Sequence, residues 1–362
     1  MTEAVPELRI AAFGPSGSGK TTLLASYYGN QQRDTFETDH GYHLEAETAS
    51  QGNDLLQCYY FMEDGKFPEN TDDFREFRFD MRVLDVDDPG LKIVWYDYPG
   101  GWWSNDPQNA SEKNARDQAI AKLLTSHVGL LVIDGEKYRK DGISCVRQQL
   151  DQFRNEIKRI TRRAGQNGQP IEDFPGLWII ALSKADLFGD KFTAKSFCKD
   201  VVKGANEQLS GLAKAVDSDS FGKQFLLLSS VDAEGNTVKD ATKFIGLQLL
   251  APLAMSTMLS KAAEDAAAES VPSGPAWWLG RAADALGWID SLDDILPPKY
   301  QLISQLLKVI AVKDIIDGTM DDYKQQQQEA AAKGKAIEAA VATMRMEMAH
   351  PDASKAYFEN QK

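Results

Sequence analysis

The chain has 362 residues, of which 43 % are hydrophobic and 26 % are charged, a composition typical of globular proteins rather than disordered or fibrous ones. Its formal net charge of -14 argues against nucleic acid as a partner, because binding to a phosphate backbone requires clustered Lys and Arg. Three widely separated cysteines (Cys58, Cys145 and Cys198) match neither a disulfide scaffold nor a paired-cysteine zinc site.

Five short apolar segments predict strands. Continuous runs of Val, Ile and Leu suit parallel strands that are buried on both faces, with helices as crossovers between them. The predicted strands are 8–13, 92–96, 128–133, 177–182 and 225–228. Amphipathic spacing predicts helices at 20–28, 111–126, 142–164, 193–216 and 238 to about 267. This alternation predicts an α/β fold with a doubly wound, mostly parallel sheet.

One predicted strand interrupts the alternation of strand and helix. The segment Phe74–Asp85 alternates between apolar and polar residues, and only a short turn with Pro89 and Gly90 separates it from the strand 92–96. A connection this short joins antiparallel neighbours, so we expect an antiparallel edge strand.

The last third of the chain has a different composition. Pro, Gly and Trp, including Trp277 and Trp278, are frequent between 269 and 298, and helical patterns follow at 299–316 and 319–348. We therefore expect a first domain over 1–250, with an insertion at about 31–73, and a C-terminal α-helical appendage over 251–362.

A phosphate-binding loop lies between the first predicted strand and the first predicted helix. Residues 14–21 match G-x-x-x-x-G-K-[ST], and the flanking elements are those that this loop requires. Backbone N–H groups of the loop and the helix N-terminus would surround a phosphate, Lys20 would reach the β- and γ-phosphates, and the Thr21 hydroxyl would bind Mg²⁺. The expected nucleotide contacts here are Gly14, Ser16, Gly17, Ser18, Gly19, Lys20, Thr21 and Thr22.

Further motifs follow the later strands. The strand 92–96 ends in Asp97-Tyr98-Pro99-Gly100, which resembles the D-x-x-G motif of Ras-like and translation-factor-related P-loop GTPases. The resemblance spans about residues 8–250 and implies a GTP-binding regulatory protein of bacterial type that uses GTP or GDP and Mg²⁺. It also implies that Asp97 approaches Mg²⁺ through water and that the N–H of Gly100 senses the γ-phosphate, so Lys20, Thr21, Asp97 and Gly100 are the expected catalytic residues.

Two more motifs point to guanine. Ser183-Lys184-Ala185-Asp186 is similar to the N-K-x-D motif of that family, with Ser183 in place of Asn. The carboxylate of Asp186 can accept from the N1 and N2 donors of guanine, a pattern that adenine does not present. Ser229, Ser230 and Val231 resemble the loop that supports the base in the same family. The loss of the Asn amide at Ser183 predicts weaker guanine selectivity.

The resemblance also predicts slow catalysis. Ras-like proteins carry a Gln after D-x-x-G that orients the attacking water, and this chain has Gly101 at that position. A partner protein, or the second subunit of a homodimer, would then supply the missing group. A threonine between 31 and 73 is expected to bind Mg²⁺, with Thr38 preferred over Thr35 and Thr48.

Interaction surfaces and alternative functions remain open. Trp102 and Trp103 either anchor a partner or pack inside, and the C-terminal helices offer a second surface for an effector or activator. A P-loop ATPase is one alternative, because the strand 128–133 ends in Asp134 as a Walker B strand does. A scaffold that binds a nucleotide without hydrolysing it is the other. Without a signal sequence or an apolar stretch of about 18 residues, we expect a cytoplasmic protein with no transmembrane segment.

Overall fold

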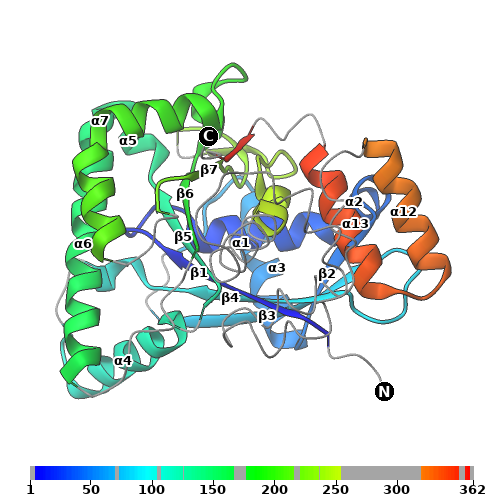
Figure 1. Cartoon of the computed structure of the whole chain (residues 1–362), viewed down its shortest axis with the longest axis horizontal. Helices are drawn as coiled ribbons and strands as arrows, with labels where there is room; N and C mark the ends of the chain where they lie inside the picture. The colour runs from blue at the N-terminus through cyan, green and yellow to red at the C-terminus, as the bar shows by residue number, and fades with distance from the viewer. Residues whose placement is uncertain are drawn as a thin grey trace, which may run out of the picture.

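A single sheet of eight strands organises the computed structural model, which describes residues 5–69, 73–103, 107–124, 126–166, 177–215, 221–235, 237–253, 319–349 and 355–358 (Figure 1). The strand order is β10-β7-β6-β5-β1-β4-β3-β2. The strands are β1 (Glu7–Phe13), β2 (Tyr42–Ala46), β3 (Arg75–Val83), β4 (Leu91–Asp97), β5 (Val128–Ile133), β6 (Leu177–Leu182), β7 (Gln224–Leu227) and β10 (Ala356–Phe358).

The centre of the sheet is parallel, as predicted. Strand β1 pairs in parallel with β4 and β5, and β6 pairs in parallel with β5 and β7. Strand β3 is antiparallel to β4, as the short turn predicted, but it is not an edge strand, because β2 pairs with its outer side. Strand β10 is antiparallel to β7 and closes the opposite edge. Both edge strands lie where the sequence showed no strand pattern.

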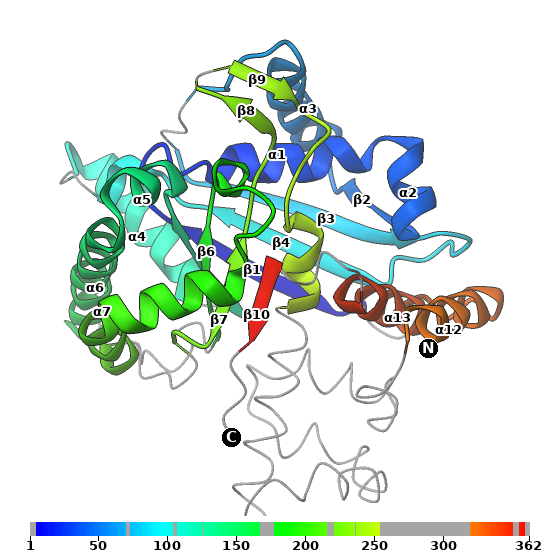
Figure 2. The same cartoon turned by 90° about the horizontal axis from the view of Figure 1, so that it is seen from above.

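Helices cover both faces, so the fold is a doubly wound α/β sheet (Figure 2). The helices are α1 (Lys20–Gln31), α2 (Asp34–His40), α3 (Ala49–Glu63), α4 (Ala110–Leu124), α5 (Gly135–Asp141), α6 (Ile143–Gln166), α7 (Ala194–Ala215), α12 (Met320–Ala332) and α13 (Ala336–Ala349), with the 3-10 turns η1 (Gly100–Trp103), η2 (Ala185–Phe188) and η3 (Leu247–Leu249). Side chains of α1, α3 and α13 share one core cluster, and side chains of α6 and α7 share the other.

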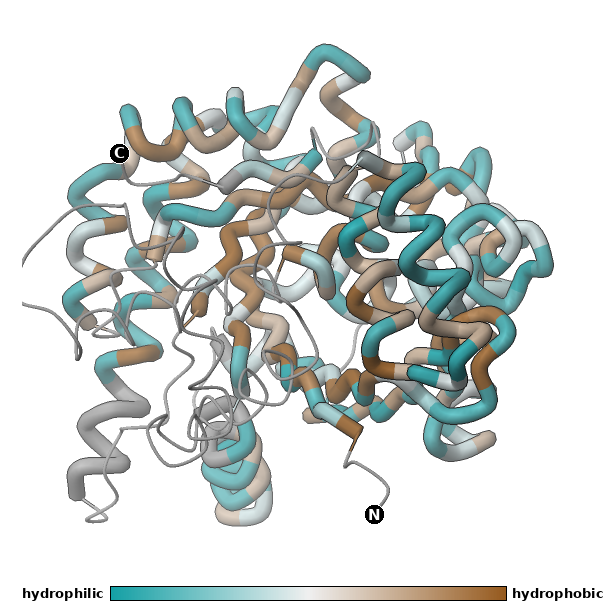
Figure 3. The backbone as a smooth tube through the Cα atoms, turned by 45° about the vertical axis from the view of Figure 1, so that its right-hand side comes forward, coloured by the Kyte–Doolittle hydropathy of each residue, from teal (hydrophilic) through white to brown (hydrophobic). Residues whose placement is uncertain are grey.

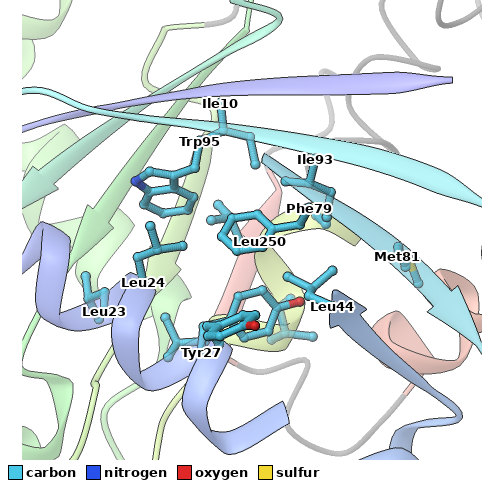
Figure 4. Close-up of a cluster of buried hydrophobic side chains, with 14 of the residues drawn as sticks. Ile10, Leu23, Leu24, Tyr27, Leu44, Phe79, Met81, Ile93, Trp95 and Leu250 are labelled. Carbon is cyan, nitrogen blue, oxygen red and sulfur yellow. The ribbon is translucent and has the colours of Figure 1, made fainter. Parts of the chain in front are cut away.

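Alternation along the strands divides the core between the two faces. In β1, Leu8 and Ile10 join the α1 side, whereas Ala11 and Phe13 join the α6 side. Figure 4 shows the α1 side, where Leu24 of that helix lies against aromatic and aliphatic side chains of the sheet. Most residues of the central strands are hydrophobic, and many residues of the outer helices are hydrophilic (Figure 3). Burial on both faces explains why these strands read as continuous apolar runs.

One predicted helix is wrong over its first part. The chain does not form a helix from Val238. It forms a hairpin of β8 (Asp232–Glu234) and β9 (Thr237–Asp240), and α-helical structure begins only at Leu250, after η3. The backbone N–H of Thr242 donates to the Asp240 side chain over 2.9 Å, a local bond that favours a turn over a helix. The predicted helix from Gly142 is also preceded by a short helix, α5, that the pattern did not reveal.

The C-terminal helices pack on the β3 end of the sheet. Ala339, Ala340 and Met344 of α13 belong to the α1-side core. His40 at the end of α2 lies 2.5 Å from the carboxylate of buried Glu347 in α13. The predicted elements at 269–316, with Trp277 and Trp278, lie outside the described residues. Among the helices that the structure describes, none is long and apolar enough to cross a bilayer.

Candidate nucleotide-binding site

The loop between β1 and α1 has the backbone that its glycines allow. Gly17 and Gly19 have φ values of 78° and 86°, in the left-handed region that side chains disfavour. Gly14 is required for space, since a Cβ there would lie 2.7 Å from the Ser18 hydroxyl and 2.8 Å from the carbonyl of Val132. The loop ends at Gly19, and α1 begins at Lys20 with its first N–H groups available to an anion.

Lys20 and Asp97 are buried charged groups beside the loop. The Lys20 ammonium donates to the carbonyl of Gly14 over 2.9 Å, and the Thr21 hydroxyl donates to the carboxylate of Asp97. Burial lowers the pKa of Lys20 and raises the pKa of Asp97, and the attraction between the two charges opposes both shifts. The Oδ1 atom of Asp97 is buried and has no hydrogen-bond partner among the described residues. Each group is therefore a counter-charge for the other, but this attraction does not outweigh the effect of burial on either pKa.

Gly100 places the end of β4 against the loop. A Cβ on Gly100 would lie 2.3 Å from the backbone nitrogen of Ser16 and 2.5 Å from its Cα. Only glycine allows η1 to approach the phosphate-binding loop this closely. Trp102 in η1 is buried, with its ring 5.3 Å from Tyr98 and the Arg116 guanidinium 5.2 Å above it. For Trp102 the packing interpretation is correct and the exposed partner anchor is wrong.

The loops that follow β6 and β7 form the second half of the site, opposite the half formed by the phosphate-binding loop and the end of β4. Lys184 has a left-handed backbone with φ 52°, and its ammonium lies 3.1 Å from Asp134 and 3.2 Å from Glu136. The Ser229 hydroxyl lies 2.5 Å from Oδ1 of Asp186. Burial raises the pKa of Asp186, and the Ser229 hydrogen bond opposes that shift. Asp186 is thus held by the loop after β7, which connects two of the predicted motifs.

Both halves line one open cavity of about 270 Å³ at the carboxyl ends of the parallel strands. This is the edge where open α/β sheets bind ligands. The predicted residues that line it are Ser16, Gly17, Gly19, Lys20, Thr21, Thr22, Asp97, Gly100, Lys184, Asp186, Ser229, Ser230 and Val231. Gly14 and Ser18 shape the loop from behind and do not line the cavity.

Asp134 has a different position from the one that the ATPase alternative needs. Its carboxylate accepts the backbone N–H groups of Glu136 and Lys137 as the N-cap of α5, and it pairs with Lys184. It does not line the cavity, and the acid bonded to Thr21 is Asp97. The capping role explains why an acidic residue ends this strand.

The structure does not bring Thr38 to the site. Thr38 lies in α2, where its hydroxyl donates to the carbonyl of Asp34 over 2.9 Å, and Thr48 is the N-cap of α3. Neither lines the cavity. From the 31–73 region, the cavity wall instead contains Phe67, Pro68 and Glu69.

Most of the other cavity residues carried no sequence signal. Tyr98 from the D-x-x-G motif also lines the cavity, and Glu136 and Arg139 from α5, with Leu187, Ala233 and Gly235, complete the described wall. Leu187 directly follows the motif at Asp186, whereas Glu136, Arg139, Ala233 and Gly235 lie outside every motif and are brought here by α5 and the β8–β9 hairpin.

The residues fit a nucleoside polyphosphate with Mg²⁺. Backbone N–H groups at a helix N-terminus and a buried ammonium suit phosphate oxygens, and the Thr21 hydroxyl beside an unpartnered carboxylate oxygen of Asp97 suits a hydrated divalent cation. Lys20 would hold the phosphates, and Thr21 and Asp97 would hold the metal. The Asp186 carboxylate at the far end would accept from base donors.

No family model and no curated protein matches the chain. The solved structures that are similar to it include two P-loop proteins with low TM-scores. The bacterial selenocysteine-specific elongation factor EF-Sec has a TM-score of 0.27 and 15% identity over 62% of this chain, which spans only 26% of that protein. The signal recognition particle receptor SRb-GTP/SRX complex from Chaetomium thermophilum has a TM-score of 0.33 and 14% identity, covering 64% of this chain and 93% of that one.

Proposed function

We propose that this chain is a Ras-like P-loop GTPase that binds GTP and GDP with Mg²⁺, hydrolyses GTP slowly, and acts as a regulatory switch. The observation that supports this proposal is the meeting of the phosphate-binding loop, Asp97 and Asp186 around one cavity. Four of the segments that line its wall, which lie far apart in the sequence, each contribute the residue type that one part of the nucleotide requires.

Each residue has a role that its environment favours. Lys20 and the loop N–H groups would bind the phosphates, and Thr21 and Asp97 would hold Mg²⁺, which would supply positive charge near the transferred phosphoryl group. Because burial disfavours the ionised forms of Lys20 and Asp97 more than their mutual attraction favours them, bound phosphates and a metal would add the further counter-charges that favour both ionised forms. Gly100, in contact with the loop, responds to what the loop binds.

Slow turnover follows from Gly101. A Cβ at this position would meet no atom within 4 Å, so the residue offers no side chain to orient water although there is space for one. The same observation supports a second candidate, a scaffold that retains GTP without hydrolysing it. The two differ in whether a partner or second copy of the chain accelerates phosphate release.

Calorimetry with GTP, GDP and ATP analogues in the presence of Mg²⁺ tests the proposal. Asp186→Ala should weaken GDP binding about 100-fold, since charge-assisted hydrogen bonds to two base donors contribute roughly 1.5 kcal/mol each. Asp190→Ala is the matched control, because this nearby exposed carboxylate does not line the cavity. Lys20→Ala should abolish binding of both nucleotides.

The outcomes separate the candidates. Guanine binding that depends on Asp186, with slow phosphate release, supports a GTPase, and retention of intact GTP with every partner tested supports the scaffold. Preference for ATP, or equal binding by Asp186→Ala and Asp190→Ala, would refute the guanine assignment.

A further inference from the structure

The guanine base has two polar edges, and Asp186 can read only one of them. Guanine carries donors at N1 and N2 and acceptors at O6 and N7. A carboxylate accepts from the first pair but cannot donate to the second. Recognition of O6 and N7 therefore requires a donor from another part of the cavity wall.

Ser183 does not supply that donor. Its hydroxyl donates to the carbonyl of Ile133 over 3.1 Å, its side chain is only 1 % exposed, and it does not line the cavity. The Lys184 ammonium is engaged by Asp134 and Glu136 at 3.1 and 3.2 Å. Two of its three N–H donors are therefore occupied by carboxylates of the chain.

Arg139 is placed beside this end of the cavity by α5. A Cβ on Gly135, the first residue of α5, would lie 1.9 Å from the carbonyl of Ser183, so the helix starts in contact with the base-reading loop. Tyr138 of the same helix lies 5.7 Å from Phe188 at the end of η2. These contacts tie α5 to the Asp186 side of the site rather than to the phosphate-binding loop.

The side chain of Arg139 is available for a ligand. Glu136 and Arg139 are three residues apart, on one face of α5, and both line the cavity. Glu136 is occupied by Lys184. Arg139 is exposed, and no side chain or backbone group in the described parts of the chain pairs with it. Its planar guanidinium can donate two parallel N–H bonds, the geometry that pairs with O6 and N7 of guanine.

We propose that Arg139 is a specificity-determining residue that donates to O6 and N7 of the guanine base and replaces the donor that Ser183 does not provide. The inference rests on the proposed function, because it assumes that guanine occupies the Asp186 end of the cavity. Adenine presents an N6 donor where guanine has the O6 acceptor, and two donors cannot form a hydrogen bond with each other. A guanidinium at this position therefore disfavours adenine, as the Asp186 carboxylate does at the other edge of the base.

A comparison of GDP with 7-deaza-GDP, which lacks the N7 acceptor, tests this contact. Binding of both ligands is measured by calorimetry with Mg²⁺ for the wild type, Arg139→Ala and Lys140→Ala. Lys140 is the matched control, because it is the next exposed cation of α5 and does not line the cavity. The exposure of Arg139 makes a folding defect in its variant unexpected, and thermal unfolding verifies this.

We expect Arg139→Ala to lose both affinity for GDP and discrimination between GDP and 7-deaza-GDP. The wild type and Lys140→Ala should bind GDP about 10-fold more tightly than 7-deaza-GDP, and Arg139→Ala should bind GDP about 10- to 100-fold more weakly than the wild type, as expected for a bidentate pair. Arg139→Ala should distinguish the two ligands by less than about twofold, because the group that reads N7 is gone.

Other results would overturn the proposal. If Arg139→Ala weakens both ligands by the same factor and keeps the wild-type ratio, Arg139 contacts the sugar or the phosphates instead. If Arg139→Ala binds GDP like the wild type while Asp186→Ala does not, this inference fails and the proposed function stands. If the wild type binds no guanine nucleotide, both fail.

Discussion

The contact between Gly100 and the phosphate-binding loop predicts the effect of one added methyl group. In Gly100→Ala, the new Cβ would lie 2.3 Å from the Ser16 nitrogen, whereas ordinary contacts begin near 3.4 Å. The neighbouring atoms belong to the backbone, so no side-chain rotation can relieve the overlap. Either η1 or the loop has to move by about 1 Å, the difference between these two distances.

The size of that shift sets the expected losses. Overpacking of this kind costs about 1–3 kcal/mol of stability. A displacement of about 1 Å in positioning groups can lower activity about 100-fold. We therefore expect Gly100→Ala to unfold at lower denaturant concentration and to bind GTP analogues about 10- to 100-fold more weakly. Chemical denaturation and calorimetry measure the two effects.

The adjacent glycine provides the control. A Cβ on Gly101 would meet no atom within 4 Å, so Gly101→Ala should retain the affinity for nucleotide and change stability by less than about 1 kcal/mol. If Gly100→Ala and Gly101→Ala behave alike, η1 does not press on the loop, and the sensing role that we assign to Gly100 is wrong.

Two further predictions concern stability. Burial lowers the pKa of His127 to about 3, and its Nδ1 accepts the backbone N–H of Arg9, so folding favours the neutral ring. The resulting contribution to the free energy of unfolding is complete above pH 6.5 and is lost as the pH falls toward 3. Lowering the pH from 7 to 5 should therefore remove about 1–2 kcal/mol of this contribution from the wild type. His127→Gln has no such contribution to lose, and urea unfolding at both pH values measures the difference. An equal pH dependence in both proteins would contradict this. Glu347→Ala should cost about 1–3 kcal/mol because it leaves His40 without its buried partner, whereas Glu338→Ala removes only a surface ion pair and should cost less than about 1 kcal/mol. Equal losses in thermal or urea unfolding would show that His40 does not anchor α13.

Local sequence patterns were sufficient for the central sheet. Strands β5 and β6 begin and end at the predicted residues, because runs of Val, Ile and Leu buried on both faces have few alternative structures. The phosphate-binding loop was equally clear, since its glycines at positive φ and the flanking strand and helix are dictated by neighbours in the chain. The motifs at Asp97 and Asp186 also lie where parallel strands end, so their meeting at one edge of the sheet could be expected.

Long-range pairing decided the rest. Strand β10 is three residues long, and nothing in Ala356–Phe358 itself indicates that it joins β7. Thr38 was preferred for the metal because threonine was the expected ligand type, but the contacts of α2 with the C-terminal helices hold it elsewhere. An acidic residue at the end of an apolar strand, such as Asp134, can be either a metal ligand or a helix N-cap. Only the start of α5 directly after Asp134 shows that it is a cap.

Features that depend on neighbours in the chain can thus be predicted from the sequence: the buried strands, the loop at Lys20, and the motifs that end at Gly100 and Asp186. Which remote groups complete the cavity depends instead on how the segments pack in three dimensions. Arg139 lines the cavity on the same side as Asp186 because Gly135 lets α5 approach the carbonyl of Ser183, which follows the neighbouring strand. Such contacts depend on how distant segments pack, and a local pattern cannot encode them.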